Sequence, residues 1–330
     1  MVRSLSVAAA EKVTYFEELP PELIIIIFEL LTPDDLCKAF LDLNERINCI
    51  VKSMLNMSLK VTQQYADFTK NFRPHQFHRL VIPICASMNF EITQFSPQLR
   101  SLTIIHPTHH QLTVIHPDYF PNLQYLNIES PSAFLCQLIF SNRFPRLTKV
   151  CLTQVNLSRR WTQSPSIRSL TMYSDDPQTF QRVLQACPSL QTFNFRGQSM
   201  PSIPRSINPH LLLKYLSLET MQASPFDKNG SLHLLLSKLP NLLRVSLSGR
   251  HLQYNKDFDL EGLAEILNHT VPRLAFFLVE ITGTPPLCDP VDDIHPLFRH
   301  IVYSTRSMII LSHMSLLRKK SDNIKSIIFV

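Results

Sequence analysis

The spacing of apolar residues changes along the chain and divides it into two regions. Before residue 56, apolar residues such as Leu23, Ile27, Leu30 and Leu31 recur at three- and four-residue intervals, the period of one helix face. From Phe77 onward the chain repeats the motif Leu-x-x-Leu-x-Leu, with other apolar residues substituted, and polar positions alternate with apolar ones as in a strand. The sequence therefore predicts a short helical region followed by a longer region of repeated strands.

Start signals divide residues 16–55 into three helices. Leu19-Pro20-Pro21-Glu22 places a proline at the first helical position and an acid in the first turn, and both are favoured there. Thr32-Pro33-Asp34-Asp35 gives a capping residue, a proline and an acid three residues after the cap. Asn44 can end the second helix and cap the third.

The isoleucine run at 24–27 leaves two other interpretations of this region open. Four β-branched residues in succession lower helix propensity and suit a strand. The three helices could also be the first part of one continuous helical core. The neighbouring start signals favour three separate helices.

Nine instances of the repeated motif are present, and their spacing is nearly regular. Successive first positions differ by 22, 24, 24, 20, 23, 23, 29 and 32 residues, and most steps fall within the roughly 20 to 29 residues of leucine-rich repeats. Helix candidates at 133–140, 178–186, 232–239 and 260–267 lie between the instances. The alternative is a mixed α/β domain, because chance matches are common in leucine-rich chains. The instances begin at Phe77, Leu99, Leu123, Leu147, Ile167, Leu190, Leu213, Leu242 and Leu274.

The residues between the apolar positions of each strand are predicted to point outward, toward the concave side of a solenoid. They form three columns across the strands, with small polar residues in the middle and tyrosines and arginines at the sides, the types most enriched in binding hot spots. Both charge signs occur, so a phosphate- or nucleic-acid-specific surface is not indicated. We predict a protein ligand, and a solvated face without a ligand is the alternative. The predicted substrate-binding residues are Tyr125, Lys149, Tyr173, Arg196, Tyr215 and Arg244.

Composition excludes several classes of protein. Apolar residues make up 45% and charged residues 18%, which supports a sizeable buried core. With 5 glycines and 24 prolines the chain has no glycine-rich phosphate loop, and its net charge of +6 is too diffuse to indicate nucleic-acid binding. The seven cysteines are widely spaced and form no Cys-x-x-Cys pair, which predicts reduced intracellular thiols. Because no apolar run is long enough for a secretory signal or a membrane span, we expect a cytoplasmic or nuclear protein with no membrane partner.

The sequence gives no sign of catalytic or metal chemistry. The densest group of possible metal ligands is His106, His109, His110 and His116, but it lies in a proline-bounded loop with no cysteine or carboxylate at ligand spacing. No signature places a base beside a thiol. We therefore expect no metal, no cofactor and no catalysis.

The helical region resembles an F-box. The residues that carry the resemblance are Leu19-Pro20-x-Glu22-Leu23, Ile27-Phe28, Leu31, Pro33, Asp35-Leu36 and Leu43-Asn44-x-Arg46. The resemblance covers about the first sixth of the chain and implies binding to the Skp-type adaptor of a cullin-RING ubiquitin ligase. Ile26, where the family more often has a polar residue, and the apolar pair Phe40-Leu41 depart from the family pattern. They could widen the partner interface or pack onto the repeat domain. The positions carried over as adaptor-binding are Leu19, Pro20, Leu23, Ile27, Phe28, Leu31 and Leu36.

The resemblance and the repeats together imply a non-catalytic substrate-recognition subunit of a Skp, cullin and F-box type ubiquitin ligase. Its partners would be the adaptor, through it the cullin and RING subunits, and a protein substrate. The alternative is a leucine-rich-repeat scaffold outside any ligase, in which the helices cap the array. The expected fold is α+β, a three-helix module followed by an irregular solenoid with a parallel sheet. The expected boundaries are a flexible N-terminus at 1–15, the module at 16–55, a linker at 56–76, the repeat domain at 77–283 and a C-terminal extension or cap at 284–330.

Overall fold

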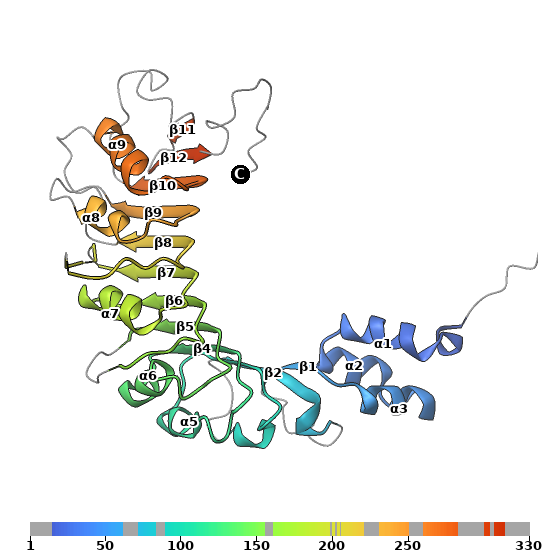
Figure 1. Cartoon of the computed structure of the whole chain (residues 1–330). Coiled ribbons are helices and arrows are strands. Elements are labelled where there is room, and N and C mark those ends of the chain that lie inside the picture. Colours follow the sequence, from blue (N-terminus) through green and yellow to red (C-terminus); the bar gives the residue numbers. More distant parts are fainter. Residues whose placement is uncertain are drawn as a thin grey trace, which may run out of the picture. The chain divides into compact units, whose positions relative to one another are not determined.

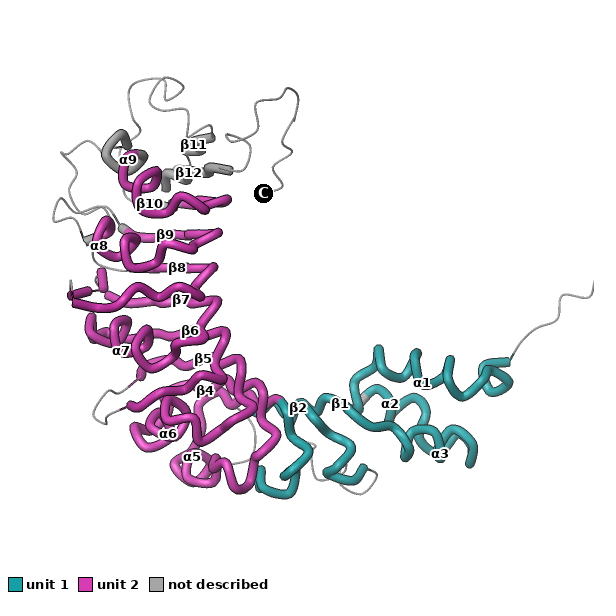
Figure 2. The backbone as a smooth tube through the Cα atoms, viewed as in Figure 1, with its two compact units in different colours: residues 1–100 teal, residues 101–330 magenta. Residues whose placement is uncertain are grey.

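The computed structural model of the chain forms two compact units, residues 1–100 and residues 101–330 (Figure 2). The structure describes residues 15–61, 72–83, 90–155, 161–198, 200–201, 203–204, 206–220, 231–250, 260–282, 300–303 and 307–313. Nearly all of the expected flexible N-terminus and most of the expected C-terminal extension lie outside these ranges, as do Cys85 and Cys288. The sequence predicts that the repeat domain begins at 77, whereas the second unit begins at 101. The first motif instance, which starts at Phe77, therefore belongs to the first unit.

Unit 1 begins with the three predicted helices. They are α1 (Pro21–Glu29), α2 (Pro33–Phe40) and α3 (Glu45–Ser53), preceded by a short 3-10 turn, η1 (Phe16–Glu18). The isoleucine run is helical, so the strand interpretation is wrong.

The predicted caps account for where these helices begin. Pro21 occupies the first turn of α1, where its missing N–H removes no intrahelical hydrogen bond. The side chain of Thr32 accepts a hydrogen bond from the Asp35 N–H at 3.2 Å, and the side chain of Asn44 accepts one from the Ile47 N–H at 2.8 Å. Each satisfies a backbone donor that the helix itself cannot pair.

The three helices pack around an aromatic cluster. Phe16, Phe28 and Phe40 lie with their ring centroids 4.8 to 6.2 Å apart. The side chains of Phe28 and Ile24 are fully buried, and α3 contacts both α1 and α2. Unit 1 therefore has a helical core of its own, built from one face of each helix.

Unit 1 also contains two parallel strands, β1 (Met57–Lys60) and β2 (Phe77–Ile82), with short 3-10 turns η2 (Pro74–Gln76) and η3 (Thr93–Phe95). The sequence predicts a linker over 56–76, but β1 lies inside it and pairs with β2. Gln76 is 2% exposed, and its side-chain amide donates to the backbone carbonyls of Lys52 and Met54 at 3.0 Å each. This buried side chain satisfies carbonyls at the end of α3, so the helices and strands of unit 1 share hydrogen bonds.

Unit 2 is built on eight parallel strands that follow one another in chain order. The strands are β3 (Ser101–Ile104), β4 (Tyr125–Glu129), β5 (Lys149–Thr153), β6 (Ser169–Tyr173), β7 (Thr192–Gly197), β8 (Tyr215–Thr220), β9 (Arg244–Arg250) and β10 (Phe276–Thr282). Two further strands continue the sheet in antiparallel pairing, since β12 (Ser307–His313) pairs with β10 and β11 (His300–Tyr303) pairs with β12.

Helices lie between the strands of unit 2 and cover one side of its sheet (Figure 1). The helices are α5 (His109–Val114), α6 (Ala133–Ile139), α7 (Gln178–Ala186), α8 (Ser231–Ser237) and α9 (Leu260–Thr270). The last four are the helix candidates predicted from the sequence, and all four are present.

The repeated motif fills the interior of unit 2. From β3 to β9 the second and third apolar residues of each motif are at most 2% exposed, as is Phe277 in β10. With ten parallel strands in order, two in unit 1 and eight in unit 2, and helices between them, the fold fits a leucine-rich-repeat-like solenoid, as predicted.

The residues between the apolar positions line up across the strands as the sequence predicts. We call the sheet face that carries them the outer face. Thr103 is an exception, because it is buried although its column is predicted to face outward. The first column is Ser101, Tyr125, Lys149, Ser169, Thr192, Tyr215, Arg244 and Phe276, and the second is Thr103, Asn127, Cys151, Thr171, Asn194, Ser217, Ser246 and Leu278. The third pairs Glu129 with Thr153 and continues through Tyr173, Arg196, Glu219, Ser248 and Glu280.

The turns after the first strands of unit 2 repeat as well. His106, Ser130 and Gln154 each follow the third column and have φ of 53°, 50° and 53°, in the left-handed region. The Ser130 N–H donates to the Thr153 carbonyl at 3.1 Å, and the Ser130 hydroxyl donates to the Gln154 side chain at 2.7 Å. The sequence lacks the asparagine ladder of regular leucine-rich repeats, and these contacts supply hydrogen bonds to the turns in its place.

Candidate functional site

The most exposed apolar surface of unit 1 is one face of α1. Leu23, Ile26, Ile27 and Leu30 are 47%, 55%, 36% and 82% exposed. Their spacing of three and four residues places them on one side of the helix, and we call them the α1 ridge. Isolated exposed apolar residues need no explanation, but a contiguous row of four on one helix indicates an interaction surface.

The structure divides the predicted adaptor-binding residues into two groups. Leu23 and Ile27 lie on the α1 ridge, Pro20 is exposed, and Leu19 and Leu31 are half-buried. Phe28 and Leu36, by contrast, are 0% and 1% exposed and belong to the core of the unit. In this structure these two support the surface from beneath and offer no surface of their own.

The two departures from the F-box pattern have different places. Ile26 lies on the α1 ridge and widens it, as the sequence suggested it could. Phe40 is half-buried in the aromatic cluster, 4.8 Å from the ring of Phe28, and Leu41 is half-buried at the end of α2. The apolar character of α2 therefore serves the packing of unit 1 itself.

The corner before α1 is held by an arginine from α3. The Arg46 guanidinium donates to the Leu19 carbonyl at 2.7 Å and also to the Glu17 carbonyl. These bonds connect residues 27 and 29 positions apart, so they fix the chain that enters Pro20 against the third helix. Hydrogen bonds from a charged donor are stronger than neutral ones, which favours a defined corner beside the ridge.

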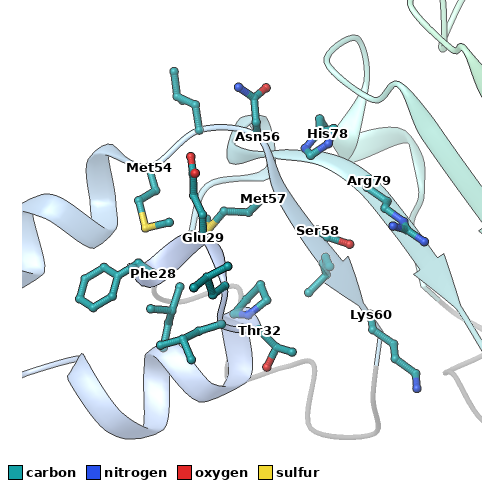
Figure 3. A pocket seen from close by; sticks show the side chains of 16 residues that line it. Phe28, Glu29, Thr32, Met54, Asn56, Met57, Ser58, Lys60, His78 and Arg79 are labelled. Atoms are coloured by element: carbon teal, nitrogen blue, oxygen red, sulfur yellow. The ribbon is translucent and has the colours of Figure 1, made fainter. Parts of the chain in front are cut away.

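An open cavity of about 570 Å³ lies beside the ridge, within unit 1 (Figure 3). Its walls come from the end of α1 and the start of α2, from residues 54–60 and from β2. Leu30 and Leu31 line it from α1, Leu55 lines it with 59% of its surface exposed, and Lys60 and Arg79 stand at the opposite side in Figure 3. The exposed apolar surface of α1 therefore continues into a concave, partly charged hollow.

His78 is the titratable group in this cavity whose pKa is shifted. Burial lowers the pKa of His78, and the charges of Arg100 and Arg79 lower it further, while the Met57 and Asn56 backbone opposes the shift. The ring is neutral at neutral pH as a result. The fixed charges on this side of the cavity are therefore those of Lys60 and Arg79.

In unit 2 the predicted substrate-binding residues lie on the outer face as three neighbouring pairs. Register places Tyr125 beside Lys149, Tyr173 beside Arg196, and Tyr215 beside Arg244. The six residues therefore form three pairs, each with an aromatic ring and a cation on adjacent strands. Such pairs combine apolar area with a charge, which suits contact with a protein.

Specific contacts hold several of these side chains. The Lys149 ammonium lies 5.4 Å from the centre of the Tyr125 ring, and the Arg244 guanidinium lies 4.5 Å from the centre of the Phe276 ring. Arg196 forms an ion pair with Glu219, with Nη2 and Oε2 2.6 Å apart. The first column therefore presents cations stacked on aromatic rings, whereas the third column presents a cation that is already neutralised.

Tyr173 donates a hydrogen bond to the Asp175 carboxylate at 2.8 Å. That hydrogen bond raises the pKa of Tyr173, with smaller contributions in the same direction from desolvation and the Asp175 charge. The phenol therefore stays protonated and acts as a neutral donor.

No disulfide joins the cysteines of the described residues, and the buried thiols are unreactive. Burial raises the pKa of Cys136 and of Cys187 to about 12 each, so neither forms a thiolate at neutral pH. Burial also raises the pKa of Cys151, against the opposing charge of Lys149. Within the described ranges no group of three or more His, Cys, Asp or Glu side chains is placed to hold a metal ion.

No model of a known family matches this chain, and no curated protein matches it closely enough to be a relative. Among the residues that the structure describes, no helix is long and apolar enough to cross a membrane.

The adaptor-binding set assigned from the sequence leaves out four residues of these surfaces. Leu30 and Ile26 were placed on a helix but not assigned to the set, although they are more exposed than Leu23 and Ile27. Arg46 was part of the F-box pattern, yet its contacts with residues near Pro20 could not be foreseen from spacing. Leu55 carries no signal in the sequence, because its exposure depends on how α3 ends beside β1.

Proposed function

We propose that this protein is the substrate-recognition subunit of a Skp, cullin and F-box type E3 ubiquitin ligase. The helices of unit 1 bind the adaptor, and the outer face of unit 2 binds a protein substrate. The protein performs no catalytic step and acts by raising the concentration of its substrate near a conjugating enzyme held elsewhere in the complex.

The α1 ridge is the observation that carries the adaptor half of this proposal. Four aliphatic side chains are exposed on a helix that begins at an exposed proline corner, in the part of the chain that resembles an F-box. Fully burying one such side chain contributes about 1.5–3 kcal/mol, so covering four that are about half exposed contributes roughly 3–6 kcal/mol before the losses of association. A surface of this kind is stabilised by a partner helix or groove.

The outer face of unit 2 supports the substrate half. Every column residue from Tyr125 to Ser248 is exposed or half-buried, whereas the apolar residues between them are buried. Tyrosines and cations are adjacent on three pairs of strands. The face is rigid because each strand is hydrogen-bonded on both sides, and rigid side chains lose less entropy on binding.

A pull-down with purified Skp-type adaptor tests the adaptor half with the full chain. The wild-type chain should retain the adaptor, and the double variant Leu23→Asp, Ile27→Asp should lose at least about a hundredfold in affinity, because it places two charges in an apolar interface. Both residues are substantially exposed, so the variant should keep its circular dichroism spectrum.

Leu43→Asp is the matched control. Leu43 is 56% exposed in unit 1 but lies outside α1, so the same substitution there should leave adaptor binding intact. Failure of the wild-type chain to bind adaptor would overturn the proposal. Equal loss in the control would show that the ridge is not the contact.

One observation favours a second function, the scaffold in which the helices of unit 1 stabilise the strands. Gln76 ties the end of α3 to the turn before β2, and α2 contacts β1. Under this function the helices are part of the fold and no adaptor is required. The two functions differ in the adaptor pull-down with the intact chain. A ligase subunit should retain the adaptor, and a scaffold outside a ligase should not.

Deleting residues 1–55 does not separate these functions. The deletion removes the carbonyls of Lys52 and Met54 that the buried Gln76 amide contacts, and uncovers β1. Either function therefore predicts that β1 and β2 become less stable. Point substitutions on the exposed ridge change the surface and leave these bonds in place.

A further inference from the structure

Four basic side chains gather at one end of the strands of unit 2. Lys149 and Arg244 belong to the first column, and Arg168 and Lys214 immediately precede β6 and β8. All four are exposed. Because the strands are parallel, their N-terminal ends share one edge of the sheet, and we call these four residues the basic edge.

Backbone hydrogen bonds show that the basic edge follows the register of the sheet. The N–H of Arg168 donates to the carbonyl of Thr148 at 2.8 Å, and the N–H of Lys214 donates to the carbonyl of Gln191 at 2.9 Å. The residues immediately before the first column are therefore aligned across the strands like the columns themselves. At about 4.8 Å per strand, the four steps from β5 to β9 span roughly 19 Å.

The charges of the basic edge are not neutralised within the described part of the chain. No ion pair there involves any of the four, and the acids of the outer face stand at the other end of the strands. Glu129 and Glu219 lie in the third column, where they pair with His106 and Arg196. Four residues along a strand separate the first and third columns by roughly 13 Å, so the cations at one edge of the outer face stand apart from the carboxylates at the other.

Within the first column, the residues between the outermost cations are polar but uncharged. In the first column Ser169, Thr192 and Tyr215 lie between Lys149 and Arg244. The two end cations are stacked on the rings of Tyr125 and Phe276, which limits their motion. Hydroxyl groups between two fixed cations can hydrogen-bond to a backbone that crosses the strands.

We propose that the basic edge binds an extended acidic segment of a partner protein that crosses β5 to β9. The segment carries anionic side chains, carboxylate or phosphate, about six residues apart, which fit the cations at the two ends. The spacing follows because an extended chain rises about 3.3 Å per residue and the edge spans roughly 19 Å. This inference rests on the proposed substrate role of the outer face and names the chemistry of the substrate.

A nucleic acid fits this edge less well than a peptide. A polynucleotide carries a negative charge on every residue and would bring further phosphates toward the third column, where Glu129 and Glu219 stand. A peptide can present anionic groups at the two ends and neutral residues between them. The hydroxyl-lined middle of the first column suits that pattern.

Peptide binding to the full chain, measured by fluorescence anisotropy, tests the inference. The probes are pools of labelled ten-residue peptides, degenerate except for glutamate at the second and eighth positions. Matched pools carry phosphoserine or glutamine at those positions, or glutamates only two residues apart. The widely spaced glutamate or phosphoserine pool should bind, and binding should fall severalfold between about 0.05 and 0.5 M salt. The stronger of these two pools identifies the source of the anion.

Charge reversal at the basic edge should weaken this binding. Lys149→Glu with Arg244→Glu should weaken it by at least about tenfold, and Lys149→Gln with Arg244→Gln by less. Lys52→Glu with Arg73→Glu makes the same change of net charge in unit 1, on two exposed residues that do not line the cavity, and should have no effect. All four substituted residues are exposed, so circular dichroism should show folded protein in each variant.

Three outcomes would overturn the inference. They are binding of none of the anionic pools, equal binding of the glutamine pool, and preference for a single-stranded oligouridine probe that competes with the peptides. Adaptor pull-down with the same variants keeps this result separate from the proposed function. If the adaptor binds and the peptides do not, only the inference about the basic edge fails.

Discussion

The two units place their apolar residues in opposite ways. In unit 1 a row of aliphatic side chains on α1 remains exposed, with Leu30 at 82%. In unit 2 the motif residues of β3 to β9 are at most 2% exposed, and the outer face is made mostly of polar, aromatic and charged residues. The strands of unit 2 thus bury their apolar side chains within the unit, whereas α1 leaves four of its own exposed.

Under the two proposals above, one chain carries two kinds of binding surface, and this difference shows how to tell them apart. Apolar burial is insensitive to salt, while contacts between exposed charges weaken as salt screens them. A partner of the α1 ridge should stay bound at high salt, and a partner of the basic edge should be released. The predictions below test the contrast between the units, in order of decreasing effect.

The largest effect is expected from opening a cavity in unit 2. Phe193 is fully buried in β7, with its ring centroid 4.8 Å from that of Phe180. Phe193→Ala should lower the free energy of unfolding by about 3–5 kcal/mol. Leu30→Ala on the exposed ridge should change it by less than about 0.5 kcal/mol. Urea denaturation followed by circular dichroism measures both, and equal losses would break the contrast between the units.

A smaller effect is expected where unit 1 depends on a single buried polar side chain. Gln76→Ala removes the donor to the carbonyls of Lys52 and Met54, which should destabilise unit 1 by about 1–3 kcal/mol. Hydrogen exchange should show the loss in α3 and β2. Gln98→Ala, at an exposed glutamine of the same unit, should leave exchange unchanged. Unchanged exchange in the Gln76 variant would show that the stability of α3 and β2 does not depend on the hydrogen bonds of this side chain.

The cap of α3 should contribute less. Asn44→Ala removes the acceptor for the Ile47 N–H and should reduce stability by about 1 kcal/mol. Asn44→Asp keeps a side-chain acceptor and should restore most of the loss. Thermal unfolding of both variants measures the difference. An equal loss in the aspartate variant would mean that the asparagine acts otherwise than as a cap.

The smallest effect is expected from the titration of His78. Its pKa lies below the ordinary value of 6.5, so the folded state binds fewer protons than the unfolded state as pH falls through that value. Unit 1 should therefore lose stability below about pH 6.5 and gain none above it. The loss should be small, because the ring is only half-buried and solvent screens its charge. His78→Asn should flatten the pH dependence of hydrogen exchange in β2, and a steeper dependence in this variant would contradict the assignment.

Local chemistry made much of the fold predictable from the sequence. Thr32 and Asn44 carry their capping signals within three residues of the bonds they form. The columns of the outer face follow from alternation alone, since a strand has a period of two and consecutive parallel strands in this fold keep one register. The order of α1 to α3, of β2 to β10 and of α6 to α9 could therefore be written down before the structure.

Long-range contacts made the rest unpredictable. β1 was expected to be a linker, because a strand of four residues without the repeated motif is recognised only by its pairing with β2. Gln76 reads as an ordinary polar residue until its amide meets carbonyls 22 and 24 positions earlier. Exposure of the α1 ridge also depends on which face of the helix the rest of unit 1 covers. These features depend on tertiary packing, which spacing along the chain does not encode.

The unbroken register of β3 to β10 separates recognition from folding. From β4 to β10 each strand adds one residue to every column, so the surface has the form of a grid whose rows are the strands. The outward residues of one row could be exchanged for those of another without altering any interior side chain. New ligands could then be acquired row by row, through changes that leave the hydrophobic interior intact.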